Sequence, residues 1–195
     1  MKKTLILLLL FAVSLIQIAP AAAWSTTTHH EIADETYYAL PVNVQEKLSL
    51  EAMQDGSDDP DIKFFDFKNH HYPESYDKAT YWLDKGKESY NAGNYSYASY
   101  CFGVASHYIS DSFSAPHCEV GCSSIAHALY ETRAMFLTPQ ITYSNGDIES
   151  IMVEGNLEGK ADWEGWLGNE DDSYIQSDLN DAVSASYVAI KSSVS

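Results

Sequence analysis

Five potential metal ligands lie between residues 107 and 131 of the sequence. They are His107, Asp111, His117, His127 and Glu131. His107 and Asp111 are four residues apart, and so are His127 and Glu131, so a helix would place each pair on one of its faces. Imidazole nitrogens and carboxylate oxygens are the ligands that zinc and similar divalent metals prefer in proteins. This stretch therefore predicts a metal site.

The other four histidines of the chain occur as two adjacent pairs, His29–His30 and His70–His71. Acidic side chains precede the second pair, in a segment rich in Asp and Pro: Asp58, Asp59, Asp61 and Asp66. Histidines that cluster near carboxylates are typical of metal ligands, so these segments are candidates for the same site.

The periodicity of apolar residues predicts helices that would position these side chains. We expect them at about 28–40, 43–53, 76–90, 95–113, 123–136 and 173–192. Residues 56–73 read as a turn-rich loop and residues 141–166 as an irregular segment containing several glycines. Pro116 should end the helix that carries Asp111, which would place His117 on the following loop. The fold class expected is all-α, a single-domain helical bundle over residues 24–195.

The first 23 residues have the pattern of a secretory signal peptide. Lys2 and Lys3 precede an apolar run over residues 5–18, and small residues 21–23 form a cleavage site. The predicted exported protein begins at Trp24, and its expected location is extracellular.

The formal net charge of −17 disfavours stable association with nucleic acid. Export would permit a disulfide between Cys118 and Cys122, which stand four residues apart, although zinc ligation by the same pair is an alternative. Cys101 is expected to be a buried free thiol on a helix.

Taken in order, these residues resemble the motif of the zinc-dependent phospholipase C family, which is related in fold to the single-strand-specific zinc nucleases. The motif comprises an N-terminal Trp, a first-helix His, an Asp before a His-aromatic loop, then H-x3-D-x5-H and H-x3-E. The matching residues are Trp24, His29, Asp61, His70, His107, Asp111, His117, His127 and Glu131. The resemblance implies a mostly helical enzyme that holds three zinc ions in one cleft.

The resemblance also implies a role for each of these residues. One zinc would be held by Asp61, His70, His107 and Asp111. A second would be held by Trp24, His29 and Asp111, with Asp111 bridging, and the third by His117, His127 and Glu131. Asp61 would also act as the catalytic base. His29 is preferred to His30 and His70 to His71, while Asp58, Asp59 and Asp66 remain alternatives to Asp61.

The resemblance is not uniform across the chain. Ser110 stands where the family usually has Gly, and Ile62 replaces a tyrosine of the choline-binding aromatic cage. The short spacing of Trp24 and His29 resembles the nuclease branch, whereas Glu131 resembles the phospholipase branch. Trp163 and Trp166 are expected to be core residues, with the rim of the cleft as the alternative.

The function expected is a secreted three-zinc phosphodiesterase that hydrolyses glycerophospholipids to diacylglycerol and a phosphorylated headgroup. The alternatives are a zinc nuclease or 3′-nucleotidase, and a non-catalytic zinc-binding export protein. We expect a phospholipid substrate met at a membrane surface, no stable nucleic-acid partner, and a monomer.

Overall fold

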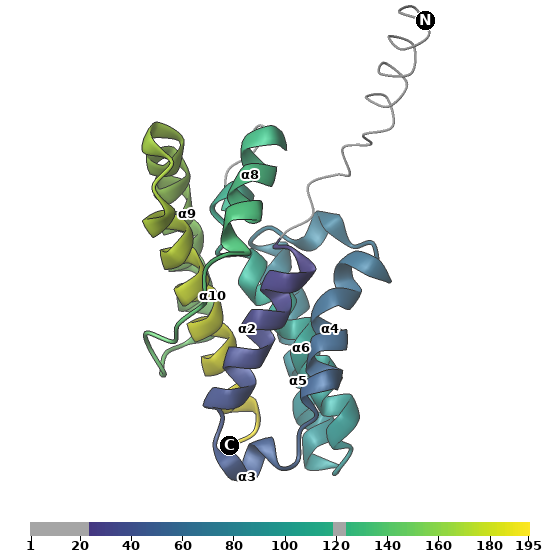
Figure 1. The fold of residues 1–195 in the computed structure, drawn as a ribbon. Helices are drawn as coiled ribbons and strands as arrows, with labels where there is room; N and C mark the ends of the chain where they lie inside the picture. The colour runs from purple at the N-terminus through teal and green to yellow at the C-terminus, as the bar shows by residue number, and fades with distance from the viewer. Residues whose placement is uncertain (1–23, 119–123) are drawn as a thin grey trace, which may run out of the picture.

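The computed structural model describes residues 24–118 and 124–195. The predicted signal peptide and Cys122 therefore lie outside the described residues. The elements, shown in Figure 1, are α2 (Thr26–Ala39), α3 (Val42–Gln45), α4 (Leu50–Ile62), the 3-10 turn η1 (Phe67–Asn69), α5 (Glu74–Asn91), α6 (Tyr95–Asp111), α7 (Ala115–Cys118), α8 (Ser124–Ala134), α9 (Ile148–Asn169) and α10 (Asp172–Ser193). No strand occurs in these two ranges, so the all-α fold class is confirmed.

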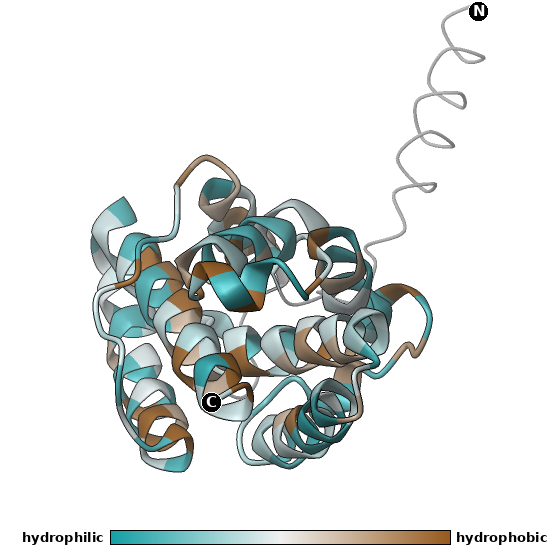
Figure 2. Cartoon of the chain, turned by 90° about the horizontal axis from the view of Figure 1, so that it is seen from below, coloured by the Kyte–Doolittle hydropathy of each residue, from teal (hydrophilic) through white to brown (hydrophobic). Residues whose placement is uncertain are grey.

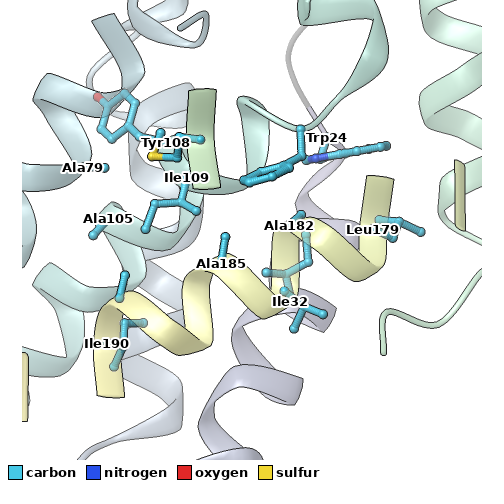
Figure 3. Close-up of a cluster of buried hydrophobic side chains, with 14 of the residues drawn as sticks. Trp24, Ile32, Ala79, Ala105, Tyr108, Ile109, Leu179, Ala182, Ala185 and Ile190 are labelled. Atoms are coloured by element: carbon cyan, nitrogen blue, oxygen red, sulfur yellow. The ribbon is translucent and has the colours of Figure 1, made fainter. Parts of the chain in front are cut away.

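Helix α6 is the centre of the bundle and packs against α2, α4, α5 and α10. Every residue from Cys101 to Asp111 is buried. Figure 3 shows the core that α6 shares with α10, which includes Ala105 and Ile109 of α6 and Ala185 and Ile190 of α10. Figure 2 shows polar residues over much of the outward-facing surface of the helices. The buried position of α6 explains why polar side chains at its end, such as His107, are shielded from solvent.

Helices α4 and α6 approach each other so closely that glycine is required at the contact. A Cβ atom on Gly103 would lie 2.0 Å from the carbonyl oxygen of Met53, and one on Gly56 would lie 2.2 Å from that of Tyr100. This contact brings the end of α4, including Asp61, beside His107 on α6.

The structure corrects the predicted boundaries around the second helix. The predicted helix over 43–53 is divided into α3 and α4, and α4 begins where Ser49 accepts a hydrogen bond from the Ala52 amide at 3.2 Å. Helix α4 then continues to Ile62 through a segment that we expected to be a loop. Pro60 removes one intrahelical hydrogen bond, and the helix ends two residues later.

The expectation of an irregular segment at 141–166 was wrong, because α9 covers most of it. Asp147 caps this helix by accepting a hydrogen bond from the Ser150 amide at 3.0 Å. Its glycines permit close packing rather than breaking the helix. A Cβ atom on Gly155 would lie 2.1 Å from the ring of Phe113, and one on Gly159 would lie 2.5 Å from Cys118 Sγ.

Several smaller expectations can also be followed in the structure. Cys101 is a buried free thiol on α6, as predicted. Cys118 is buried, with Sγ 3.4 Å from the Ser112 carbonyl oxygen, but its predicted disulfide partner falls outside the described residues. Trp163 and Trp166 are core residues, which rules out a role at the rim. No helix among the described residues has the length and apolar character needed to cross a membrane.

Candidate metal centre

The carboxylate of Asp111 faces histidines from three parts of the chain. Its Oδ1 atom lies 3.5 Å from Nε2 of His29 on α2. Its Oδ2 atom lies 3.1 Å from Nδ1 of His70, which follows η1, and 3.1 Å from Nε2 of His107 on α6. Asp111 itself is fully buried. The two oxygens therefore face different imidazoles, which is the arrangement expected of a carboxylate between two cations.

The orientation of His107 is fixed by a backbone contact. Its Nδ1–H donates to the carbonyl oxygen of Ser57 at 2.7 Å, which leaves the lone pair of Nε2 directed toward Asp111. Such a hydrogen bond from the remote nitrogen is the usual means by which proteins orient a metal-binding imidazole. Because any residue type can offer a carbonyl, the sequence carried no signal for this role of Ser57.

Ser110, which stands where the family usually has Gly, supports two of the candidate ligands. Its hydroxyl donates to the carbonyl oxygen of His107 at 2.9 Å and lies 3.3 Å from Nδ1 of His29. The hydroxyl oxygen can thus accept the Nδ1–H of His29, leaving Nε2 of that ring for a metal. The departure from the family pattern is compatible with the metal centre.

The structure distinguishes Asp61 from the neighbouring acidic residues. Asp58 lies 2.8 Å from His30, Asp59 pairs with Lys63 at 2.9 Å, and Asp66 pairs with Lys78 at 2.9 Å. The carboxylate of Asp61 instead lies within 4.8 Å of ligand atoms on His29 and His107. Its Oδ1 atom is also 3.7 Å from Nδ1 of His70.

Within each histidine pair, one member faces the cluster and the other has a different partner. His29 and His70 contact Asp111, as described above. Nε2 of His30 is 2.8 Å from Asp58, and Nδ1–H of His71 donates to the backbone carbonyl oxygen of His117 at 2.8 Å. The structure therefore favours His29 and His70 as ligands and gives His71 a supporting contact that sequence reasoning missed.

A further group is formed by His117, His127 and Glu131. Oε1 of Glu131 lies 2.6 Å from Nε2 of His127, one turn earlier on α8, and 3.7 Å from Nε2 of His117. His117 lies on the four-residue helix α7 and not on a loop, so that prediction was wrong. Helix α6 ends at Asp111, before Pro116 is reached, and Pro116 is itself part of α7. These three residues come together as the sequence spacing predicted.

The candidate ligands form three sets whose coordinating atoms lie within 4.8 Å of one another. These are His29, Asp61 and His107; His70, His107 and Asp111; and His117, His127 and Glu131. The last set matches one of the zinc sites implied by the resemblance. The first two differ from the implied division, because His107 belongs to both and His29 is grouped with Asp61. They form one continuous cluster around Asp111.

Trp24 lies beside this cluster, at the start of the described chain. Its indole N–H donates to the carbonyl oxygen of Ser110 at 2.9 Å, and the side chain is fully buried in the core seen in Figure 3. Its backbone N–H lies near the carboxylate of Asp111, without forming a hydrogen bond to it, and tends to lower the pKa of that group. The Trp24 backbone is thus close to the expected second site.

Burial shifts the pKa values of the cluster toward the neutral forms of its members. Desolvation lowers the pKa of His70 and of His127 to about 4, and it raises the pKa of Asp61 to about 6 and of Asp111 to about 7. It also raises the pKa of Glu131 to about 10. The imidazoles are therefore neutral at pH 7, as metal binding requires, while the carboxyl groups lack a compensating positive charge.

Several buried polar atoms of the cluster have no hydrogen-bond partner within the described structure. They are Nε2 of His29, Oδ1 of Asp61, both carboxylate oxygens of Asp111 and Nδ1 of His117. A buried polar atom left without a partner costs about 1–3 kcal/mol, so such atoms rarely occur together without a ligand. Zinc accepts nitrogen and oxygen donors and would supply the missing positive charge. The residues present therefore fit zinc.

A family model described as "Zinc dependent phospholipase C" matches residues 28–181. The chain belongs to the zinc-dependent phospholipase C family. The matched region contains every candidate ligand from His29 to Glu131, and its helical content agrees with the all-α fold. No curated protein matches the chain.

Proposed function

We propose that this protein is a secreted phosphodiesterase that uses three zinc ions to hydrolyse glycerophospholipids to diacylglycerol and a phosphorylated headgroup. The observation that carries the proposal is the convergence of buried imidazoles and carboxylates on one region, where several of the ligand atoms have no hydrogen-bond partner among the described residues. Membership of the zinc-dependent phospholipase C family supports the reaction class.

The residues that would hold the metal are the nine candidate ligands. They are Trp24, His29, Asp61, His70, His107, Asp111, His117, His127 and Glu131. Bound zinc ions act as Lewis acids toward phosphate oxygens and lower the pKa of water from about 16 to about 7. The two oxygens of Asp111 face separate histidines, so this residue would hold two cations at a fixed spacing.

Asp61 is the residue that we assign as the base. Burial raises the pKa of its carboxyl group to about 6, close to the value at which a base works well at neutral pH. Its Oδ1 atom has no hydrogen-bond partner in the described part of the chain and can accept a proton from the water that attacks phosphorus. The water oxygen bonds to phosphorus and the bond between phosphorus and the glycerol oxygen breaks. That oxygen takes up a proton from solvent water, which gives diacylglycerol and the phosphorylated headgroup.

Exposed apolar side chains lie directly beside the candidate base. Phe65 is 67 % exposed and has a positive φ of 51°, in a loop that follows Asp61, and Ile62 and Phe64 are exposed in the same segment. A non-glycine residue in this conformation is held there by its surroundings at some cost. Exposed aromatic and aliphatic groups next to the base would suit a substrate presented by a lipid surface.

A pocket of about 680 Å³ adjoins this loop. Its lining combines the rings of Phe64, Tyr81, Trp82 and Tyr108 with polar and charged side chains, which are Asp66, Lys68, Asn69, Asp77 and Lys78. Phe64 stacks on Trp82 with ring centroids 5.9 Å apart, and the ring of Tyr108 lies 5.9 Å from that of His70. The pocket therefore adjoins the exposed loop, and its lining is mixed rather than apolar.

The test compares substrates for one purified, zinc-loaded sample. Phosphatidylcholine vesicles, single-stranded DNA and a chromogenic phosphocholine ester are incubated with the protein, and the released products are measured. Release of diacylglycerol is the expected result, whereas release of nucleotides alone would replace the proposal with a nuclease. Full zinc occupancy without turnover of any substrate would indicate a non-catalytic protein.

Asp61→Asn provides the matched check on mechanism. Loss of a general base should reduce kcat by about 100- to 10,000-fold. Asp84→Asn, on the exposed face of α5, changes the charge equally and should retain the activity. Retention of full activity by Asp61→Asn would contradict the assigned role of Asp61.

Secretion is part of the proposal and has its own test. N-terminal sequencing of protein recovered from the medium should begin at Trp24. A version that retains one extra residue before Trp24 should bind fewer zinc ions. The Trp24 nitrogen beside Asp111 would then belong to a peptide bond and would no longer be a free amine that can bind a metal.

A further inference from the structure

The ligands His117, His127 and Glu131 are supplied by two short elements near the surface. Helix α7 has four residues and α8 has eleven. Much of α8 is exposed, including Ile125 and Leu129. A four-residue helix cannot maintain its own position, so the geometry of this metal group depends on what α7 and α8 contact.

One atom on the C-terminal helix contacts both elements. Oδ2 of Asp178, on α10, accepts a hydrogen bond from the Ala115 amide at 2.7 Å and another from the Tyr130 hydroxyl at 2.7 Å. Ala115 is the first residue of α7, two positions before His117. Tyr130 lies on α8, directly before Glu131. A single carboxyl oxygen therefore connects three helices.

We propose that Asp178 is a positioning residue for the zinc ion held by His117, His127 and Glu131. It belongs to none of the three ligand sets and acts through the backbone of α7 and the side chain of Tyr130. Supporting residues of this kind commonly change metal affinity by about 10- to 100-fold. The inference rests on the proposed zinc site but not on any particular substrate.

Tyr130 is itself held rigidly, so its hydrogen bond can transmit position. Its ring centroid lies 5.0 Å from that of Trp166, 5.7 Å from that of Trp163 and 6.1 Å from that of Trp24. The hydroxyl has little freedom to find another acceptor, because the residue is fully buried. Loss of the Asp178 oxygen would therefore leave the hydroxyl without its partner.

The environment of Asp178 indicates which substitution preserves its function. The side chain is 4 % exposed, and burial together with the charges of Asp162 and Asp181 raises its pKa. Asp162 also shares a hydrogen bond with it. Asparagine keeps one oxygen for Ala115 and Tyr130 and offers an N–H to Asp162, so Asp178→Asn should preserve the network. Asp178→Ala removes the acceptor of both hydrogen bonds.

The experiment measures zinc retained per chain during dialysis against increasing chelator, for the wild type, Asp178→Asn, Asp178→Ala and Tyr130→Phe. We expect Asp178→Asn to behave as the wild type. Asp178→Ala should release one zinc at about 10- to 100-fold lower chelator concentration, with Tyr130→Phe between the two. Circular dichroism of each sample reports whether the helices remain folded.

A double variant identifies which ion is affected. His127→Ala should lose one zinc, and Asp178→Ala/His127→Ala should then lose no more than His127→Ala, because both changes act on the same ion. A further loss in the double variant would overturn the proposal, and so would wild-type retention by Asp178→Ala. If Asp178→Ala does not fold, wild-type retention by Tyr130→Phe would overturn it instead.

The result is independent of the proposed reaction. A wild-type protein that binds three zinc ions but hydrolyses no phosphodiester would refute the proposed function, while the zinc-retention measurements would still test Asp178. A wild-type protein that binds no zinc at the His117 group would refute both.

Discussion

Oδ1 of Asp111 lies 3.5 Å from Nε2 of His29, while Oδ2 of the same carboxylate faces His70 and His107. Because the two oxygens serve different histidines, Asp111→Asn should reduce the zinc content by more than one ion per chain and lower activity by more than about 100-fold. Metal analysis by mass spectrometry checks the first effect. Asp84→Asn is the exposed control, and loss of only one ion would refute the bridging assignment.

The two adjacent histidines at positions 70 and 71 should behave differently when replaced. His70→Ala removes a side chain that faces Asp111, so at least one zinc should be lost. His71→Ala removes only a hydrogen bond to the His117 carbonyl, so the zinc count should stay the same while one ion binds about 10-fold more weakly. Equal loss of zinc in both variants would show that the two histidines had been wrongly distinguished.

The close contact between α4 and α6 should not tolerate a methyl group. Gly103→Ala places a Cβ atom 2.0 Å from the Met53 carbonyl oxygen, so the helices must separate. We expect the free energy of unfolding to fall by about 1–3 kcal/mol, measured by urea denaturation. Zinc affinity should fall as well, because α4 carries Asp61 and α6 carries His107.

Gly168→Ala is the matched control for this substitution. Gly168 lies near the end of α9, and a Cβ atom there would meet no other atom within 4 Å. Alanine in this helix should stabilise the protein by about 0.5–1 kcal/mol. If both alanine variants were destabilised equally, the α4–α6 contact would not account for the effect of Gly103→Ala, and the packing argument would fail.

The carboxyl group of Asp181 should cause a pH-dependent loss of stability. Burial, followed by the charges of Glu158 and Asp162, raises its pKa from 3.8 to about 6. Since the folded protein binds this proton more tightly than the unfolded chain, the stabilising effect is present below pH 4 and is lost as the pH rises through 6. Asp181→Asn should therefore show an advantage in Tm over the wild type that grows between pH 4 and pH 7.

The wild type serves as the control for Asp181→Asn at both pH 4 and pH 7. Both proteins are measured with the same excess of zinc, and only the difference between them is used. The backbone carbonyl of Asp181, which accepts a hydrogen bond from Tyr143, is unchanged by the substitution. A difference in Tm that stays constant with pH would show that the carboxyl group does not titrate in this range.

The sequence predicted the parts of the site that depend on local geometry. His127 and Glu131 meet because four-residue spacing on a helix brings side chains together wherever that helix lies. Helix α9 was missed because glycine usually disfavours a helix interior. Gly155 and Gly159 are tolerated there because Phe113 and Cys118 occupy the space of a side chain, and such a tertiary contact leaves no local pattern.

The contacts that support the ligands were the least predictable. The carbonyl of Ser57 orients His107, and that of His117 receives His71, although neither contact depends on the type of residue that supplies the oxygen. Asp178 likewise lies far from the last candidate ligand in the sequence, because the whole of α9 separates Glu131 on α8 from Asp178 on α10. These pairings arise only when α4, α7 and α10 have packed together, so a reading of one segment at a time does not find them.

The nitrogen and oxygen atoms around Asp111 that have no partner among the described residues have a consequence for the lifetime of the protein under the proposed export. The burial of these atoms destabilises only the protein without metal. A cation that binds the native fold and not the unfolded chain increases the free energy of unfolding. Chains secreted into a medium poor in zinc would open more often and be degraded faster by extracellular proteases. The half-life of the protein would then report how much zinc its surroundings contain.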